Sequence, residues 1–300
     1  MYALLHSSSV DVWETFFPKQ AKTSYSSSKY LNISGNEQYF VTCSKFKDLP
    51  VNGAIRFTET NDSCKLLVYL SNFENCSASN KNNGGAIYFY DKGCVVQLLN
   101  YANNCGVFSN SYGHYCYCSP SDSASSYNFI NCSTITQCGS NNNGQNTINE
   151  EDGLIKLIND NITSNFANKG SAFFINSPDD VSNVKYCNIA YNINFKTDEY
   201  LIRYNAGWKT HKIELCNIIN NKCSNGDVIS AAECYVEVSH CSIFGNQQSN
   251  IGSITIEDIV THITQQINTL SCIEYISNDN SIVPTVHIKL WNKFICKRRR

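Results

Sequence analysis

The sequence has few charged residues, which limits the partners that it can attract. Aspartate, glutamate, lysine and arginine make up 16% of its 300 residues, well under the usual quarter. The net charge is -2 and the isoelectric point is about 6.3. No overall field therefore draws the chain to nucleic acid or to acidic lipid, and neither is a predicted partner.

Signals for secretion and membrane insertion are also missing. No stretch is as apolar as the roughly eighteen residues that a transmembrane helix needs. Residues Met1–Ser7 lack the basic and then apolar pattern of a leader, and Asp11 and Glu14 follow soon after. The basic end Lys297–Arg300 is typical of a solvated tail. Three alternatives stay open: the chain remains in the cell with reduced thiols, leaves by an unrecognised route, or lacks a leader and anchor that belong to it.

The common catalytic signatures are absent as well. The sequence contains no G-x-x-x-x-G-K-[ST], no G-x-S-x-G and no H-E-x-x-H. His114, His211, His240 and His262 share no common position in the repeats described next, so they are expected to be surface or hydrogen-bonded residues. We therefore predict no catalytic residue, no cofactor-binding residue and no cofactor.

A recurring turn-and-strand unit dominates what the sequence does contain. Asn83–Phe89 reads Asn-Gly-Gly-Ala-Ile-Tyr-Phe, a glycine turn followed by alternating apolar positions. Asn52–Phe57 and Gly170–Ile175 repeat this shape. A unit that keeps returning indicates a repeat architecture. Three weaker copies are Gly153–Leu157, Gly226–Ser230 and Gly252–Ile256.

A second signature alternates with the first and sets the period. Its form is two polar residues, an apolar residue, any two residues and asparagine. Copies occur at Asp160–Asn165, Cys187–Asn192, Cys216–Asn221 and Cys241–Asn246, with Phe46, Phe73, Tyr101 and Ile135 at the apolar place of looser ones. The steps between apolar places are 27, 28, 34, 27, 27, 29 and 25 residues. Apolar residues alternate within each unit instead of following a helical period, which favours strands.

These patterns predict an all-β fold, a parallel β-solenoid of about eight coils with roughly 27 residues each. Each strand would pair in parallel with its equivalent one coil further on. Side chains such as Phe73, Ile87, Phe89 and Ile189 would stack in an apolar core. Asparagine tolerates the left-handed backbone of sharp corners, and its amide can bond to the next coil. The recurring asparagines are Asn165, Asn192, Asn221 and Asn246.

The repeats divide the chain into three parts. Residues 1–35 carry no repeat and are expected to form an N-terminal cap, which an open stack of strands requires. Residues 36–256 hold the repeats, with 105–152 predicted as an irregular loop insertion. Residues 257–300 are expected to supply C-terminal coils or a cap and the basic tail. Ile155 and Ile162 look too close in sequence for separate strands of ordinary coils.

The two signatures resemble a known repeat family. Gly84–Ile87 is similar to the GGAI element of polymorphic-outer-membrane-protein repeats, and the I-x-x-N copies resemble their FxxN element. Such repeats occur in bacterial autotransporter passengers and in surface proteins of parasitic protists. The resemblance covers residues 40–256 and implies a right-handed parallel β-helix, cell-surface display and an adhesin-like role. It carries no catalytic residues.

The sequence holds sixteen cysteines, some of them at suggestive spacings. Cys116 and Cys118, flanked by His114 and Cys105, come nearest to a metal cluster. Structural zinc sites prefer two ligand pairs with two to four residues between partners. We therefore predict no metal here and favour buried, stacked cysteines over zinc or a disulfide. Cys187, Cys216 and Cys241 share one position in successive coils, which indicates packing, or disulfides in an oxidising compartment.

One pair of carboxylates is a candidate catalytic site. Glu199 and Asp227 each precede an apolar residue, Leu201 and Ile229, by two positions. Stacked about 5 Å apart, they could act as a retaining glycosidase pair. Hydrated turn residues are the favoured interpretation, and no basic residue shares the position.

The function predicted from these observations is non-catalytic. A solenoid without a cluster of reactive groups favours an adhesin-like surface that binds a protein or glycan on a lateral face. Two alternatives stay open. One is a polysaccharide lyase or glycoside hydrolase built on the β-helix, and the other is a truncated or degenerate family copy without its own activity.

Overall fold

The structure, a computed structural model, describes residues 11–247 with short gaps and the backbone of 255–257. The gaps are residues 36, 59, 80–81, 109, 124, 140–143, 197–198, 206–208 and 224–225. Among the described residues, one helix, α1 (Val12–Phe16), accompanies four sheets whose paired strands are all parallel. The predicted parallel β-solenoid is therefore confirmed.

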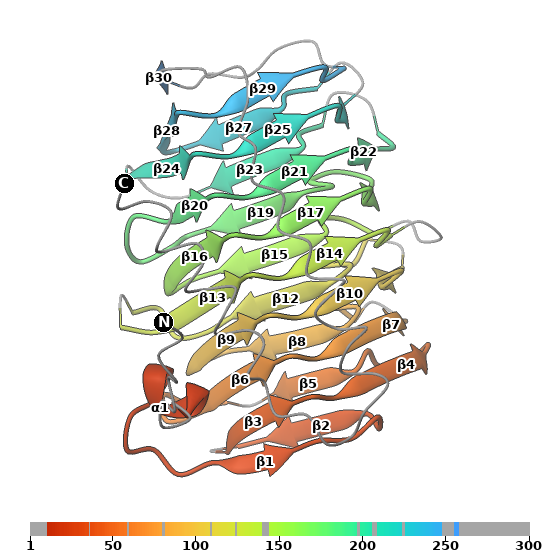
Figure 1. Cartoon of the computed structure of the whole chain (residues 1–300), viewed down its shortest axis with the longest axis vertical. Coiled ribbons are helices and arrows are strands. Elements are labelled where there is room, and N and C mark those ends of the chain that lie inside the picture. The colour runs from red at the N-terminus through yellow and green to blue at the C-terminus, as the bar shows by residue number, and fades with distance from the viewer. Residues whose placement is uncertain are drawn as a thin grey trace, which may run out of the picture.

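The chain winds through three long sheets, and each coil adds one strand to each of them (Figure 1). The ten-stranded sheet consists of β1 (Thr23–Tyr25), β3 (Gln38–Thr42), β6 (Lys65–Tyr69), β9 (Cys94–Leu98), β13 (Tyr127–Asn131), β16 (Leu154–Ile158), β20 (Asn183–Lys185), β24 (Thr210–Glu214), β28 (Tyr235–Ser239) and β30 (Thr255–Glu257).

The eight-stranded sheet starts each coil and contains the Gly-Gly-Ala-Ile unit. Its strands are β2 (Leu31–Ser34), β5 (Ile55–Thr58), β8 (Ile87–Tyr90), β12 (Cys116–Ser119), β15 (Ile148–Glu151), β19 (Phe173–Asn176), β23 (Ile202–Asn205) and β27 (Ile229–Ala232).

The nine-stranded sheet carries the asparagine signature. Its strands are β4 (Lys45–Leu49), β7 (Asn72–Ala78), β10 (Tyr101–Asn103), β11 (Gly106–Val107), β14 (Thr134–Thr136), β17 (Asn161–Thr163), β21 (Asn188–Ala190), β25 (Asn217–Ile219) and β29 (Ser242–Phe244). A short fourth sheet joins β18 (Phe166–Ala167), β22 (Ile193–Asn194) and β26 (Lys222–Cys223).

The register agrees with the second signature in all but one coil. Ile162 pairs with Ile189, Ile189 with Ile218 and Ile218 with Ile243, as the repeat predicts. The exception is Tyr101, because Ala102 is the residue that pairs with both Phe73 and Ile135. Tyr101 was a wrong anchor for a physical reason: its ring lies on the outer face, and the small alanine is the buried side chain.

Two of the weaker glycine copies also belong elsewhere. Gly226–Ser230 leads into β27 of the eight-stranded sheet, as predicted. Gly153–Leu157 instead runs into β16 of the ten-stranded sheet, and the last two residues of Gly252–Ile256 belong to β30 of that sheet. A glycine followed by alternating apolar residues therefore marks a turn into any strand of this solenoid and does not identify the sheet.

The stretch predicted as an irregular insertion is mostly regular. Residues 105–152 contain β11 to β15, and the strands β12 to β15 pair in register with their neighbours. Ile155 and Ile162 lie in β16 and β17, which are separate strands of one coil in different sheets. The extra length of this coil lies in its connections, since Ala102 and its partner Ile135 are 33 residues apart.

The N-terminal segment covers an outer face as well as an end. Strands β1 and β2, inside the predicted cap, already pair with β3 and β5. The helix α1 lies beside the ten-stranded sheet (Figure 1), where Trp13 and Phe17 pack against the outward side chains Leu67 and Val96. Asp11 caps the helix by accepting a hydrogen bond from the Trp13 amide at 3.0 Å. The predicted C-terminal part, 257–300, lies outside the described residues apart from the end of β30.

Inward apolar side chains fill most of the solenoid. Phe46 and Phe73 stack with their ring centroids 5.2 Å apart, and Phe57 stacks on Phe89 at 5.5 Å. These four rings are fully buried in one continuous core cluster. Because stacked coils place like on like, the apolar columns predicted from Phe73, Phe89 and Ile189 are present.

Left-handed backbone recurs at three corners of the coils, but not at the predicted asparagines. At the first corner it occurs at the residue before each asparagine, including Ser164, Tyr191, Asn220 and Gly245. At the second corner it occurs at Asn159, Tyr186, Leu215 and His240. The third corner follows the eight-stranded sheet and includes Asp91, Asp152, Ser177 and Glu233. An L-residue in this conformation costs about 1–2 kcal/mol, so the coil geometry overrides local preference at the tyrosines and leucine.

The recurring asparagines instead form a buried hydrogen-bonded ladder between coils. The backbone N–H of Asn165 donates to the Asn192 side chain at 3.0 Å, and that of Asn192 donates to Asn221 at 2.9 Å. The Nδ2 group of Asn192 also donates to the Ile162 carbonyl and to Asn221. The predicted bonding between coils is therefore confirmed, while the left-handed role was assigned one residue too late.

Candidate functional site

A polar centre interrupts the apolar interior in the middle of the solenoid. Cys116 and Cys118 point inward from β12, and Glu150 points inward from β15 in the next coil. Glu150 pairs with Cys118 on one side and Ile175 on the other, so it occupies a position that is apolar in most coils. One ligand atom of each of the three residues lies within 4.8 Å of those of the other two.

Two amide side chains complete this centre from the ten-stranded sheet. Gln97 lies on β9 and its Nε2 group donates to Cys118 Sγ at 3.5 Å. Asn128 lies on β13 and its Nδ2 group donates to the Cys118 carbonyl at 3.4 Å. Both side chains are fully buried and stand at positions paired with apolar residues in neighbouring coils, such as Val68 and Ile155. The interior therefore gathers two thiols, a carboxyl group and two amides from three successive coils.

Burial dominates the electrostatics of this centre. It raises the pKa of Glu150 well above its ordinary value, and it likewise raises the pKa of Cys116, and of Cys118 to about 11. The Cys116 thiol donates to Glu150 Oε1 at 3.2 Å. Without a cation, burial therefore favours the neutral forms of all three groups.

Several oxygen atoms around the centre lack a hydrogen-bond donor. They are Glu150 Oε2, Gln97 Oε1 and Asn128 Oδ1. Each residue is 0% exposed. A buried oxygen without a donor costs about 1–3 kcal/mol, so three together call for a bound water or ion, or for a proton on Glu150.

Sequence reasoning identified only part of this centre. Cys116 and Cys118 do point to the same side, as expected for a strand, but His114 and Cys105 do not join them. His114 Nδ1 accepts from the Val107 amide at 3.1 Å, next to another corner. Glu150 was missed because 105–152 was interpreted as a loop. Aligning it with Phe89 and Ile175 would have found it, as a charged residue in an apolar column.

Cys105 belongs to a column that continues the asparagine ladder. Cys76, Cys105 and Cys138 occupy the ladder position in the three preceding coils, and the Cys138 amide donates to Asn165 at 3.0 Å. The Cys105 thiol donates to the Phe73 carbonyl at 3.6 Å, as Asn165 Nδ2 does to Ile135. In these coils a thiol takes the place of the asparagine amide, and it offers one hydrogen-bond donor fewer.

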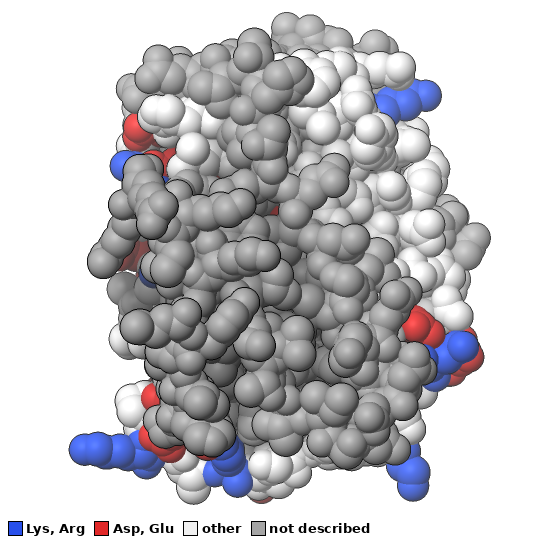
Figure 2. Space-filling model, in the orientation of Figure 1, with Lys and Arg blue, Asp and Glu red and all other residues white. Residues whose placement is uncertain are grey.

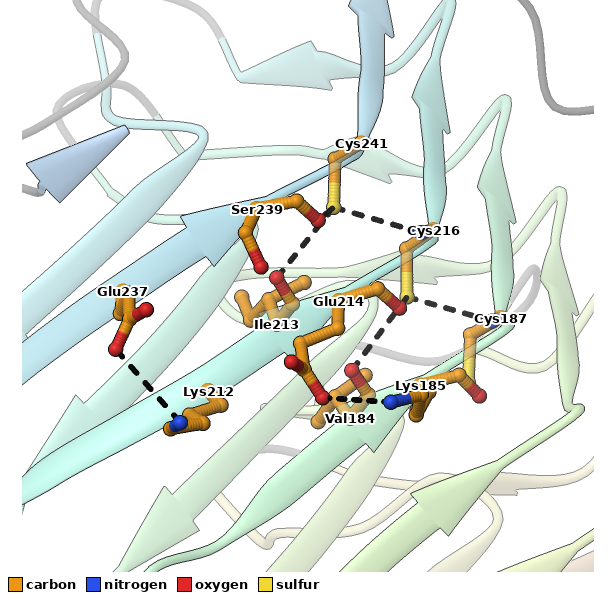
Figure 3. A network of polar contacts seen from close by, with 10 residues as sticks. All are labelled: Val184, Lys185, Cys187, Lys212, Ile213, Glu214, Cys216, Glu237, Ser239 and Cys241. Atoms are coloured by element: carbon orange, nitrogen blue, oxygen red, sulfur yellow. Dashed lines mark hydrogen bonds and ion pairs between the residues drawn. The ribbon is translucent and has the colours of Figure 1, made fainter. Parts of the chain in front are cut away.

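Cys187, Cys216 and Cys241 stand one above another at the second corner, as predicted (Figure 3). The Cys187 amide donates to Cys216 Sγ at 3.3 Å, and the Cys216 amide to Cys241 Sγ at 3.4 Å. In earlier coils this acceptor is an oxygen, such as Asp160 Oδ1 for the Ser133 amide at 2.8 Å. All three cysteines are free, and the column closes hydrogen bonds between coils.

The ladder role of Cys216 predicts a difference between two small substitutions. We expect Cys216→Ala to lower the free energy of unfolding by about 2 kcal/mol, because the buried Cys187 amide loses its acceptor. Cys216→Ser should cost less than half of this, because serine already fills the same position in the column at Ser71 and Ser133. Urea unfolding measures the stability of both variants. Equal losses of stability would show that the Cys216 sulfur contributes by packing and not as a hydrogen-bond acceptor.

The carboxylates considered for catalysis are not in register. The Leu201 amide donates to the Asp227 carbonyl at 3.0 Å, and the Ile202 amide to Val228. Glu199 therefore lies beside Gly226, where an added Cβ would be 1.7 Å from the Glu199 carbonyl oxygen. Tyr200 stands beside Asp227. The predicted stacking of Glu199 on Asp227 is wrong by one residue, and the two side chains start from opposite faces of the strand.

The two histidines that face the interior are hydrogen-bonded and neutral, and His262 lies outside the described residues. His211 Nδ1 accepts from the Ser182 amide at 3.1 Å, and its ring stacks on Tyr204 at 5.4 Å. Burial lowers the pKa of His211 to about 4, with Lys209 adding to the effect. Burial also lowers the pKa of His114 to about 4.

The pKa of His211 predicts an acid-dependent loss of stability. An unfolded histidine has a pKa of about 6.5, so below that pH the unfolded chain binds a proton that the folded chain refuses until about pH 4. Stability is therefore fully present above about pH 6.5 and falls as the pH drops toward 4, by about 3 kcal/mol. Urea unfolding of wild type and of His211→Asn should be compared at pH 7 and at pH 4. The difference between their free energies of unfolding should shrink by this amount as the pH falls. Parallel curves would contradict the assignment.

Arginine and tyrosine side chains form a row on the outer face of the eight-stranded sheet. Arg56, Tyr88 and Tyr117 are register partners on β5, β8 and β12. The Arg56 guanidinium lies 4.0 Å from the centroid of the Tyr88 ring, which stacks on Tyr117 at 5.6 Å. Tyr90 joins them 6.0 Å from Tyr88, and 46% of its surface is exposed. We call Arg56, Tyr88, Tyr90 and Tyr117 the outer aromatic row.

Charge on the described surface is sparse and locally paired. On the face in Figure 2, lysine, arginine and acidic side chains form small separate groups among the described residues. On the ten-stranded sheet, Lys185 pairs with Glu214 at 2.9 Å and Lys212 with Glu237 at 4.0 Å (Figure 3). Such exposed pairs contribute little to stability.

Parallel strands stacked coil on coil define the class of this molecule as a β-solenoid. No family model, no curated protein and no solved structure matches the chain. The part of the chain that the structure describes has no helix long and apolar enough to cross a membrane.

Proposed function

We propose that this chain is a non-catalytic β-solenoid that binds a partner protein through the outer aromatic row. The observation that carries the proposal is the side-by-side placement of Arg56, Tyr88, Tyr90 and Tyr117 on one outer sheet face. Tyrosine and arginine are enriched in protein interfaces and among the residues that dominate affinity. An adhesin-like role, with display at the cell surface, agrees with such a face.

Ring orientation favours a protein partner over a glycan. Tyr88 and Tyr117 stack with their planes 19° apart, so their faces contact one another and Arg56 covers the remaining face of Tyr88. A sugar ring needs a free aromatic face for stacking, whereas edges and hydroxyl groups suit peptide hydrogen bonds. Tyr117 donates to Glu151 at 3.0 Å, which fixes the row before binding. Little side-chain freedom is then lost on association.

The test compares two variants as bait for surface proteins of a candidate host cell. Tyr90→Ala combined with Arg56→Ala removes the accessible part of the row. Tyr235→Ala, with 60% exposure on β28 of the ten-stranded sheet, is the matched control. We expect a protein that is captured by wild type and by the control but not by the row variant. Once purified, this partner should bind wild type at least tenfold more tightly than it binds the row variant.

Three outcomes would contradict the proposal. Equal capture by wild type, the row variant and the control would mean that the outer aromatic row does not bind the partner. If the chain binds a glycan array and Tyr90→Ala abolishes that binding, the partner is a glycan and not a protein. Turnover of a polysaccharide that Glu199→Ala or Asp227→Ala abolishes would make the chain an enzyme.

A further inference from the structure

We propose that Cys116, Cys118 and Glu150 hold one Zn²⁺ ion inside the solenoid, with the side-chain oxygen of Gln97 as fourth ligand. The three residues present two sulfur atoms and one carboxylate oxygen within 4.8 Å of one another. Gln97 reaches Cys118 Sγ from the ten-stranded sheet. Thiolate sulfur and carboxylate oxygen are both zinc ligands, and the amide oxygen of Gln97 would complete four-coordination.

The separations between ligand atoms fit a tetrahedral zinc site. With Zn–S at about 2.3 Å and Zn–O at about 2.0 Å, the edge between a sulfur and an oxygen ligand is about 3.5 Å. Cys116 Sγ lies 3.2 Å from Glu150 Oε1, and Cys118 Sγ lies 3.5 Å from Gln97 Nε2. Rotating the Gln97 amide by half a turn exchanges Nε2 and Oε1, which are similar in size and differ in hydrogen-bonding role. The ligand oxygen would then take that position.

An independent observation also points to a cation. Glu150 Oε2, Gln97 Oε1 and Asn128 Oδ1 are buried acceptors without a donor. A metal ion held by the Glu150 carboxylate and the Gln97 amide oxygen would give acceptors in this centre a positively charged partner. A bound cation also reverses the effect of burial, because it stabilises the thiolate and carboxylate forms that a dry core would otherwise disfavour. Two thiolates select zinc over magnesium and calcium, which prefer oxygen ligands.

A disulfide between Cys116 and Cys118 fits the strand less well. Two positions apart in an extended strand, their Cα atoms are about 6.6 Å apart, at the upper limit of the range for disulfides. Closing that bond would leave Glu150 with the same unpaired oxygen. The register keeps both residues in line with Ile87 and Phe89 of the preceding coil.

The site would be structural and not catalytic. Cys116, Cys118, Glu150 and Gln97 are all 0% exposed, so no ligand position opens to solvent. Its ligands come from β9, β12 and β15, and an ion there would join three successive coils. Because such a closed centre cannot load after the coils have stacked, zinc would bind as the chain folds.

The test measures zinc in the full chain purified after expression with added zinc. We expect elemental analysis to find one ion per chain in wild type and none in Cys116→Ser combined with Cys118→Ser. Cys187→Ser combined with Cys216→Ser removes two other buried thiols and should retain the ion. Refolding with Co²⁺ instead of Zn²⁺ should give thiolate-to-cobalt charge-transfer absorption in wild type and control only.

A second variant keeps the proposal testable if the cysteine variant does not fold. If zinc is bound, Glu150→Leu should lower both metal content and melting temperature. If the centre holds only water, wild type will carry no zinc, and Glu150→Leu should raise the melting temperature because leucine suits a column that contains Phe89 and Ile175. Either of these two results overturns the proposal, as does zinc that survives in the variant lacking Cys116 and Cys118.

Discussion

Replacing Asn192 by alanine is expected to lower the free energy of unfolding by about 4 kcal/mol. Asn192 is fully buried and exchanges hydrogen bonds with both neighbouring coils. Its loss leaves the Asn165 amide without its 3.0 Å acceptor and the Ile162 carbonyl without its 2.9 Å donor. Each orphaned buried group costs about 1–3 kcal/mol. Urea unfolding followed by circular dichroism measures the total, and hydrogen exchange at the Asn165 amide locates it.

Two variants control for effects other than the ladder. Asn188→Ala removes a partly exposed asparagine with one hydrogen bond, 2.8 Å to Asn161, and should cost under about 1 kcal/mol. Asn192→Cys should cost less than Asn192→Ala, because Cys105 and Cys138 already fill the same column. Similar losses for Asn188→Ala and Asn192→Ala would refute the ladder as the element that joins the coils.

Replacing Phe73 by alanine should be as costly, for an apolar reason. Phe73 is fully buried, stacks on Phe46 at 5.2 Å and meets the Tyr115 ring edge-on at 6.0 Å. Truncating a buried phenylalanine removes its transfer free energy and leaves a cavity, which together cost about 3–5 kcal/mol. Because Phe46 and Tyr115 come from adjacent coils, the loss should weaken the stack on both sides. Urea unfolding is again the measurement.

Phe244 offers a matched control for this substitution. It lies on β29 of the same sheet, yet 46% of its surface is exposed. We expect Phe244→Ala to change stability by about 0.5 kcal/mol or less. A cost for Phe73→Ala below about 1.5 kcal/mol would mean that the interior is not packed as described.

Much of the fold could be predicted because stacked coils repeat their chemistry. Ile162, Ile189, Ile218 and Ile243 recur at the interval that parallel pairing requires, and the structure pairs them. Errors arose where a coil departs from the pattern. Tyr101 was taken as the buried position of its coil because it is the larger apolar side chain. Its neighbour Ala102 is the residue that pairs with Ile135.

The candidate sites were harder to predict because they depend on register between coils. Cys118 and Glu150 are 32 residues apart and meet only if the long connections of 105–152 are assigned correctly. A shift of one residue moves a side chain to the other face, which is how Glu199 and Asp227 were wrongly paired. The outer aromatic row likewise needs Arg56, Tyr88 and Tyr117 aligned over two coils.

The measurement that tests the central claim most directly is a methyl NOE spectrum of the chain labelled at isoleucine δ1 methyl groups. Adjacent coils lie about 4.8 Å apart, so we predict contacts from Ile189 to Ile162 and to Ile218, and from Ile218 to Ile243. Ile162 and Ile218, two coils apart, should show none. Missing contacts between Ile189 and Ile218, or a direct contact between Ile162 and Ile218, would contradict the stacking of coils on which the sites described above depend.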